Sequence, residues 1–328
     1  MRVLVTGKIP KEVLDVVRKE HLVEAHGEDM PMERTLLMDS IGDKHGLLCT
    51  ITDRIDDELL NKAPHLKMIA NLGVGYDNID VAAATVRRIP VSNTPDVLTD
   101  ATADLTFALI LATARRVVEG DKRTRAGKFR FWAPFHFLGR DVSGKTLGIL
   151  GLGRIGKAVA LRATAFKMQV LYHNRHRLKG SEEKGLGVTY ADLNTLLGRS
   201  DFVSVHVPLN EGTRHLIDGS ALGKMRNTAY LINTSRGPVV DEKALAKALG
   251  EGKIAGAGLD VYEKEPEVLP GLMELENVVL LPHMGSATLE TRTRMARKGA
   301  ENLLAGLRGK RPPDCLNCES LSRKSLKG

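Results

Sequence analysis

The sequence of 328 residues contains no apolar run long enough to cross a bilayer. The longest candidate, residues 107–114, falls far short of the roughly 18 to 20 residues that a membrane helix needs. An apolar start at residues 1–5 is interrupted by Lys8 and Pro10, before the core of a signal peptide could form. We therefore predict no membrane partner and a β-strand at the N-terminus.

Cysteine is scarce, because only Cys49, Cys315 and Cys318 are present. An odd count does not suggest a disulfide framework, and the Cys315/Cys318 pair resembles half of a zinc site whose second pair is missing. We therefore predict free thiols, no metal and a location in a reducing cytoplasm.

The composition lacks the signs of disorder, since 42% of the residues are hydrophobic and 27% are charged. A chain of this length suggests about two domains. The 48 Lys and Arg exceed the 40 Asp and Glu by 8, which permits anionic partners without choosing among them. Residues 120–140 combine basic side chains with aromatic ones such as Phe129, but one such stretch without a repeated stacking platform does not predict nucleic-acid binding. We predict no nucleic-acid partner.

Short β-branched runs alternate with helical patterns along the chain, which predicts an α/β fold with parallel sheets. Helices are expected over residues 101–118, apolar nearly all round, and over 287–307. The tail beyond Gly309 is expected to be a surface segment with frayed ends. Strands are expected at 2–5, 46–50, 67–71, 90–92, 146–150, 169–173, 201–206, 229–233, 256–260 and 278–281.

A glycine motif, GLGRIG at residues 151–156, follows one expected strand and opens an expected helix over 154–166. Gly151 permits a tight turn, Gly153 lets the backbone approach a pyrophosphate, and Gly156 lets helix and strand pack closely. The helix N-terminus supplies unpaired N–H groups and a partial positive charge for the diphosphate. The motif in this context predicts a dinucleotide site.

The strand expected at 169–173 ends where binders of NAD usually place Asp or Glu against the ribose hydroxyls. This chain has Asn174, Arg175, His176 and Arg177 there. A carboxylate would repel a 2′-phosphate, whereas an arginine can pair with it in a bidentate fork. We therefore predict that NADPH is preferred and that NADH is possible. The alternative is that both arginines are solvated surface charges and that Asn174 holds an ordinary ribose.

Three polar residues follow the ends of expected strands: Arg236 in NTSRG, Glu265 in DVYEKEP and His283 in LPHMGSA. Functional residues of open α/β sheets gather at the carboxyl ends of the strands. Hydride transfer to a 2-oxo acid requires a cation for the carboxylate and carbonyl, an acid for the nascent alkoxide, and a partner for that acid. The three residues are therefore our candidate catalytic residues.

With these motifs the sequence resembles the D-isomer-specific 2-hydroxyacid dehydrogenase family, and within it most closely the glyoxylate/hydroxypyruvate reductases. The resemblance spans nearly the whole chain. It is carried by NLGVGYD (71–77), ATAD (101–104), GLGRIG (151–156), HVP (206–208), NTSRG (233–237), GLDVYEKEP (258–266) and PHMGSAT (282–288).

The resemblance implies reduction of glyoxylate or hydroxypyruvate to glycolate or D-glycerate. Arg236 would clamp the substrate, while protonated His283 gives a proton to the carbonyl oxygen and the nicotinamide C4 delivers hydride to C2. Glu265 would bond the other ring nitrogen of His283, fix its tautomer and favour the imidazolium.

The resemblance also implies contacts with substrate, cofactor and partner. The N–H groups of Val74 and Gly75 would hold the substrate carboxylate, and Ser286 would contact a polar substrate. Trp132 would reach the partner subunit's active site in a homodimer; the alternative is that it anchors a dimer core. The implied cofactor positions are Thr102, Gly151, Leu152, Gly153, Arg154, Ile155, Gly156, Asn174, Arg175, His176, Arg177, His206, Val207, Pro208, Thr234, Ser235, Arg236, Asp260, His283 and Gly285, with Asp260 near the nicotinamide carboxamide.

The implied organisation is two Rossmann-like or flavodoxin-like domains with parallel sheets. Residues 1–98 and 285–328 would form a discontinuous substrate-binding domain and residues 99–284 a dinucleotide-binding domain, with the active site in the interdomain cleft. Two alternatives stay open. One is a relative acting on another acid, such as 2-ketogluconate, phenylpyruvate, lactate, phosphoglycerate or phosphite, and the other is a nucleotide-sensing corepressor of the same fold.

Overall fold

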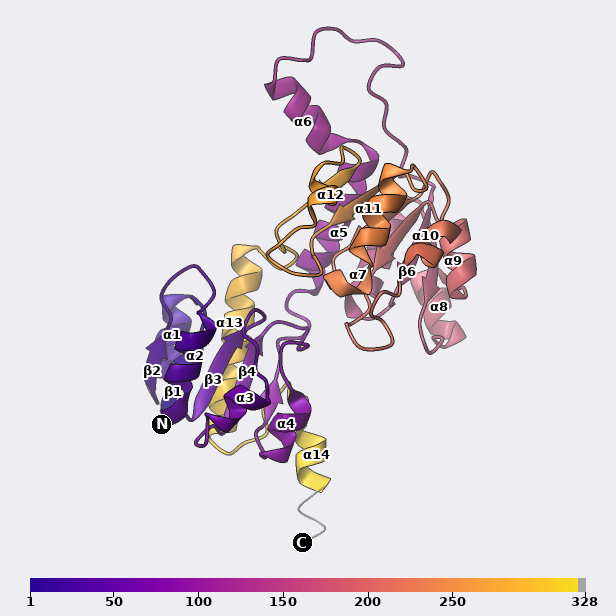
Figure 1. The fold of residues 1–328 in the computed structure, drawn as a ribbon. Coiled ribbons are helices and arrows are strands. Elements are labelled where there is room, and N and C mark those ends of the chain that lie inside the picture. The colour runs from indigo at the N-terminus through magenta and orange to yellow at the C-terminus, as the bar shows by residue number, and fades with distance from the viewer. Residues whose placement is uncertain (324–328) are drawn as a thin grey trace. The chain divides into compact units, whose positions relative to one another are not determined.

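The computed structural model describes residues 1–323 and is drawn in Figure 1. The chain divides into two compact units. Unit 1 comprises Met1–Leu98 and the chain from Ala287 onward, and unit 2 comprises Thr99–Ser286. The chain therefore leaves unit 1 once and returns to it once.

Unit 1 is a parallel five-stranded sheet in the order β2-β1-β3-β4-β5 with helices on its faces. Its central strands are buried apolar runs, and helix α13 covers one face by packing Ala300 and Leu303 against Val3 and Leu48. The elements are β1 (Arg2–Val5), α1 (Lys11–Arg18), β2 (Leu22–Ala25), α2 (Arg34–Ser40), the 3₁₀ turn η1 (Ile41–Asp43), β3 (Gly46–Thr50), α3 (Asp57–Asn61), β4 (Met68–Leu72), α4 (Val81–Val86), β5 (Val91–Ser92), α13 (Leu289–Leu307) and α14 (Cys318–Arg323).

Unit 2 is a parallel seven-stranded sheet in the order β12-β11-β10-β9-β6-β7-β8. The strand order reverses beside β6, so the loops after β6 and β9 meet at a switch point of the kind that binds ligands. The elements are α5 (Thr99–Ala114), α6 (Val117–Arg125), β6 (Thr146–Leu150), α7 (Arg154–Ala165), β7 (Gln169–His173), α8 (Gly180–Leu186), β8 (Val188–Tyr190), α9 (Leu193–Arg199), β9 (Phe202–Val205), α10 (Gly219–Lys224), β10 (Tyr230–Asn233), the 3₁₀ turn η2 (Gly237–Val239), α11 (Glu242–Gly250), β11 (Gly256–Leu259), α12 (Pro270–Met273) and β12 (Val278–Leu280).

The predicted α/β class with parallel sheets is confirmed, and three details differ from the sequence-based expectation. The expected helix 101–118 is two helices, because Arg116 adopts a left-handed backbone with φ 54° between α5 and α6. Strands β2 and β8 were not anticipated. Both lie at sheet edges and are short and only partly buried, so they lack the continuous apolar run that marks a central strand.

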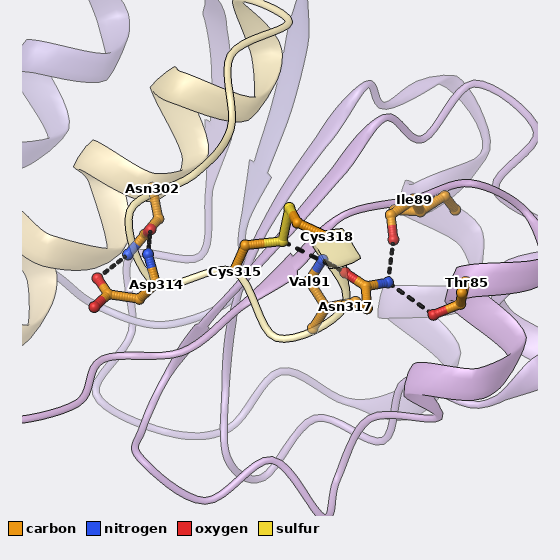
Figure 2. The surroundings of a disulfide bond; sticks show 8 residues. All are labelled: Thr85, Ile89, Val91, Asn302, Asp314, Cys315, Asn317 and Cys318. Carbon is orange, nitrogen blue, oxygen red and sulfur yellow. Dashed lines mark hydrogen bonds between the residues drawn. A yellow bond between two sulfur atoms is a disulfide. The ribbon is translucent and has the colours of Figure 1, made fainter. Parts of the chain in front are cut away.

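The C-terminal tail was expected to be a surface segment with frayed ends. Within the described residues it is held by hydrogen bonds, so fraying was wrong there, and residues 324–328 lie outside the described residues. Leu316 donates its N–H to the carbonyl of Val91 at 2.7 Å, Cys315 forms an antiparallel bridge with Ser92, and Asn317 is buried. Cys315 and Cys318 are joined by a disulfide, so the prediction of free thiols was wrong for this pair (Figure 2). The reason is local: the turn at 315–318 brings the two Cα atoms to 5.7 Å, a distance that a disulfide spans. Cys49 is a buried free thiol.

No helix within residues 1–323 has the length and apolar character needed to cross a membrane. Over the same residues, no cluster of three or more His, Cys, Asp or Glu side chains is placed to hold a metal ion.

Candidate active site

The glycine loop after β6 has the geometry of a phosphate cradle. Gly151 has φ 95°, and a Cβ there would stand 2.7 Å from the carbonyl carbon of His206. A Cβ on Gly156 would stand 2.3 Å from the oxygen of Gly151, so both positions require glycine for packing. A Cβ on Gly153 would meet nothing within 4 Å, which leaves open space in front of the first turn of α7, where Arg154 and Ile155 lie. The residues present therefore fit a dinucleotide diphosphate at this loop.

The end of β7 lies beside this loop. The side-chain oxygen of Asn174 accepts the N–H of Leu152 at 2.6 Å, which fixes the loop against the strand end. Arg175, His176 and Arg177 are all exposed. Arg177 also binds Glu183 through two hydrogen bonds of 2.8 Å, and its guanidinium carbon lies 5.5 Å from the centre of the Tyr190 ring. The hydrogen bond from Arg177 is the main reason that the pKa of Glu183 falls to about 2. Of the two predicted phosphate-binding arginines, Arg177 is thus already paired.

The loop after β9 presents His206, Val207 and Pro208 beside the glycine loop, as the contact of Gly151 with His206 requires. The Nε2 atom of His206 lies 2.8 Å from the hydroxyl oxygen of Ser204, and burial lowers the pKa of His206 to about 4. The imidazole is therefore neutral at physiological pH, so it brings no charge to the loop.

The loop after β10 is fixed by a residue that the sequence analysis did not single out, Asn233. Its side-chain oxygen accepts the N–H and hydroxyl of Ser235 at 3.1 and 3.0 Å, and its amide donates to the carbonyl of Arg236 at 3.0 Å. Thr234 is buried, with its hydroxyl 3.0 Å from that of Thr106. An asparagine that bonds the backbone two residues on is an Asx turn, so its position at a strand end was a readable signal.

The Arg236 loop packs directly on the loop that carries Glu265. A Cβ on Gly237 would stand 1.8 Å from the carbonyl carbon of Tyr262, so only glycine allows this approach. Glu242 and Glu263 each accept the other's backbone N–H, at 2.6 and 3.0 Å, and this exchange joins α11 to the same loop. The two strand-end loops are therefore held in one arrangement.

Glu265 and His283 form the central contact of the site. The Nδ1 atom of His283 lies 2.6 Å from one oxygen of Glu265, whose other oxygen accepts the N–H of Tyr262 at 3.0 Å. Partial burial acts to raise the pKa of Glu265. The hydrogen bond and charge of His283, the Tyr262 N–H and the charge of Arg236 outweigh it, so the pKa is lowered on balance. The carboxylate is thus ionised beside the imidazole and within the field of the guanidinium.

Asp260 holds the segment that carries His283. Its two oxygens accept the N–H groups of Met284 and Gly285 at 2.7 and 2.8 Å. Burial raises the pKa of Asp260, and these two hydrogen bonds oppose that rise. His283 itself adopts φ 51°, a left-handed conformation uncommon outside glycine, and the Asp260 bonds lie directly after it. Asp260 was expected near the nicotinamide carboxamide. In the structure its carboxylate holds the backbone that follows His283.

The remaining predicted residues lie elsewhere. Thr102 is buried in α5 near Gly285, and Ser286 is half-buried at the end of unit 2. Trp132 is 78% exposed on the loop that follows α6, which extends away from the sheet of unit 2 (Figure 1). Val74 and Gly75 lie in unit 1, after β4.

Comparison with known proteins finds one family, both by a family model and by relatives similar in sequence. A family model of the D-isomer specific 2-hydroxyacid dehydrogenase NAD-binding domain matches residues 107–285. The chain is 51% identical over 321 residues to a glyoxylate reductase of Korarchaeum cryptofilum, covering 97% of this chain and 96% of that protein.

Solved structures are similar over nearly the whole chain. A glyoxylate reductase from Paecilomyes thermophila has a TM-score of 0.88 and 35% identity, covering 97% of this chain and 99% of the other. An NADPH-dependent glyoxylate/hydroxypyruvate reductase from Sinorhizobium meliloti, in complex with NADP and malonate, has a TM-score of 0.86 and 35% identity over 96% of each chain.

Proposed function

Because the chain belongs to the D-isomer-specific 2-hydroxyacid dehydrogenase family, we propose that it reduces a small 2-oxo acid, glyoxylate or hydroxypyruvate, to glycolate or D-glycerate. The observation that carries this proposal is the 2.6 Å contact between His283 and Glu265. It joins an acid–base group to an ionised partner, which favours proton transfer to a carbonyl oxygen. Relatives named glyoxylate reductase support the choice of acid.

His283 serves as the proton donor in this proposal. Glu265 occupies Nδ1, so Nε2 is the ring nitrogen left to face the substrate, and the carboxylate stabilises the imidazolium that gives up the proton. Asp260 keeps the ring in place by holding the backbone after it. Once the proton has left, the neutral imidazole still bonds Glu265, so the ring stays oriented for the next turnover.

Arg236 binds the substrate carboxylate and 2-oxo group. Its positive charge also stabilises the oxygen that becomes negative as the carbonyl is reduced. Backbone N–H groups of Val74 and Gly75 hold the carboxylate, and Ser286 contacts a polar substituent such as the hydroxyl of hydroxypyruvate. The hydrogen bond from the Asn233 amide to the Arg236 carbonyl and the close approach of Gly237 to Tyr262 fix the backbone of Arg236 after β10.

A nicotinamide dinucleotide, when bound, supplies the hydride. We propose that NADPH is preferred, that Gly151, Gly153 and Gly156 admit its diphosphate, and that the preference comes from Asn174 and Arg175. The pairing of Arg177 with Glu183 reduces its share in binding a 2′-phosphate. The complex of the Sinorhizobium meliloti relative with NADP supports the preference.

We further propose that the enzyme is a homodimer in which Trp132 reaches the partner's active site, since aromatic side chains are exposed around it.

Steady-state assays test the proposal directly. Loss of reduced-nicotinamide absorbance is followed for NADPH and NADH with glyoxylate, hydroxypyruvate, pyruvate and 2-ketogluconate. We expect the highest kcat/KM with NADPH and glyoxylate or hydroxypyruvate. A ten-fold preference for NADH would refute the role of Arg175, and a higher kcat/KM for 2-ketogluconate would refute the choice of acid.

Two arginine variants separate the cofactor assignments. Arg175→Asp is expected to move the preference toward NADH by about ten-fold or more, because a carboxylate repels the 2′-phosphate. Arg177→Ala is the matched control and is expected to change the NADPH/NADH ratio much less, since its guanidinium is engaged by Glu183. Equal effects of the two substitutions would contradict this division.

A further inference from the structure

The loop that binds the substrate carboxylate in our proposal is fixed through its carbonyl groups. Thr94 donates its N–H to the carbonyl of Gly73 at 2.9 Å, and the Asn93 amide donates to the carbonyl of Val74 at 2.8 Å. A peptide group is planar and trans, so each carbonyl fixes the direction of the N–H that follows it. The bond from Thr94 therefore orients the N–H of Val74, and the bond from Asn93 orients the N–H of Gly75.

Asn93 is in turn held from the C-terminal tail. Its carbonyl accepts from the amide of Asn302 in α13 at 3.4 Å. Asn302 exchanges two hydrogen bonds of 2.9 Å with Asp314, giving its amide to the carboxylate and taking the Asp314 N–H (Figure 2). Lys298 lies 3.1 Å from the same carboxylate. Asp314 thus couples the start of the tail to the segment that orients the loop.

The next residues of the tail hold β5, the two-residue strand directly before Asn93. The Asn317 side chain accepts the N–H of Val91 at 2.9 Å and donates to the carbonyl of Ile89 at 3.0 Å and to the hydroxyl of Thr85 at 2.9 Å. β5 pairs with β4 at only two positions, so these side-chain bonds replace the strand pairing that an edge lacks. We call residues 314–318 the hook.

The disulfide closes the hook around Asn317. Cys315 and Cys318 flank Leu316 and Asn317, whose hydrogen bonds to Val91 hold β5. Figure 2 shows the disulfide beside the Asn317 side chain. A cross-link restricts the conformations that the turn can adopt when it detaches. Both cysteines are half-buried, so a small thiol in solution can reach the disulfide. Cys49 is fully buried and is less accessible to the same reagent.

From this chain of contacts we propose that the hook positions the Val74–Gly75 loop for the substrate carboxylate, and that reduction of the Cys315–Cys318 disulfide weakens oxo-acid binding. The inference rests on the proposed function. In the reduction step, a thiolate of a dithiol attacks one sulfur and breaks the bond between Cys315 and Cys318. The second thiol then closes the dithiol into a ring, so two electrons and two protons pass to the protein, which gains two thiols.

Kinetics with and without a small dithiol test the inference. For the oxidised wild type, dithiol treatment should raise KM for glyoxylate roughly three- to ten-fold, the effect of one hydrogen bond, with kcat changed less than about two-fold. The dissociation constant of NADPH should not change, because the dinucleotide site lies in unit 2. The double variant Cys315→Ser/Cys318→Ser retains Cys49 and should show the raised KM with no response to dithiol.

A measurement without turnover separates this inference from the proposed function. Hydrogen exchange of amides at residues 73–76 and 91–94 should speed up when the disulfide is reduced, and only there and in the hook. If no oxo acid is turned over, the proposed function fails while exchange still reports on the coupling. Unchanged exchange overturns the inference, and so does faster exchange with unchanged KM. Asn93→Ala should raise KM in both redox states, and a normal KM in this variant would equally overturn it.

Discussion

The Glu265 carboxylate acts on the neighbouring His283 ring through a hydrogen bond and through its negative charge. Because the pKa of Glu265 is lowered on balance, the group stays ionised at neutral pH and offsets the positive charge of a protonated ring. The amide of a glutamine would keep the hydrogen bond but remove that charge. Geometry and charge can therefore be separated at this one residue.

Glu265→Gln should lower kcat for oxo-acid reduction by about ten-fold or more, since proton donation needs the charged ring. Steady-state kinetics at neutral pH would measure this loss. An unchanged kcat would contradict a charge role for Glu265.

His206 should make the protein less stable in mild acid. Its pKa is lowered from 6.5 to about 4, so between these values the unfolded chain binds a proton that the folded protein refuses. Stability from this residue is complete above pH 6.5 and is lost as the pH falls toward 4, by up to about 3 kcal/mol of unfolding free energy. Urea unfolding at pH 7 and 4.5 should show a smaller pH effect for His206→Gln than for the wild type. Identical pH effects would mean that His206 titrates normally in the folded state.

At the scale of elements, the loops after β10 and β11 depend on a close approach at Gly237. Gly237→Ala should lower the unfolding free energy by about 2 kcal/mol or more and should abolish most turnover, because a Cβ cannot fit 1.8 Å from the Tyr262 carbonyl carbon. Gly223→Ala in α10 is the matched control. A Cβ there meets nothing within 4 Å, so the helix should gain up to about 1 kcal/mol. Calorimetry of both variants measures the difference.

Gly153 offers the opposite case, a glycine that the fold does not need. Gly153→Ala should change stability by less than about 1 kcal/mol, since its backbone is extended and its surroundings are open. Affinity for NADPH should fall by about ten-fold or more, because the methyl group occupies the path of the diphosphate. Unchanged affinity in a fluorescence titration would place the diphosphate elsewhere.

The buried parallel strands could be predicted from the sequence, whereas contacts between side chains that the fold brings together could not. Strands such as β3, β6 and β7 were predicted at their observed bounds, because a buried parallel strand is a continuous apolar run between turn residues. The motifs at strand ends indicated Glu265 and His283 as candidate residues, and the contact between them was implied by the resemblance to the family. The pairing of Arg177 with Glu183 and the Asn93 and Asn302 bonds depend on how separate elements pack together. The disulfide depends on the conformation of the turn at 315–318, which the spacing of the two cysteines alone does not give.

At the scale of the whole molecule, the sequence has one tryptophan, Trp132, and it is 78% exposed in the single chain. In the proposed homodimer this ring would enter the partner and leave water. Its emission should therefore be blue-shifted at micromolar protein and should move to the red on dilution, in step with the mass measured by sedimentation. Emission typical of exposed tryptophan at a concentration where the protein is a dimer would contradict the assignment of Trp132 to the interface.

The return of α13 to unit 1 has a consequence for biosynthesis. Ribosomes complete the seven-stranded sheet of unit 2 before they make Leu289–Leu307, the helix whose Ala296, Ala300 and Leu304 complete the core against β1, β3 and β4. Until that helix emerges, the first ninety or so residues of the nascent chain carry a bare apolar face. The segment that is translated first, Met1–Leu98, thus belongs to the unit that completes its core last, and chaperones should retain nascent chains halted before residue 289.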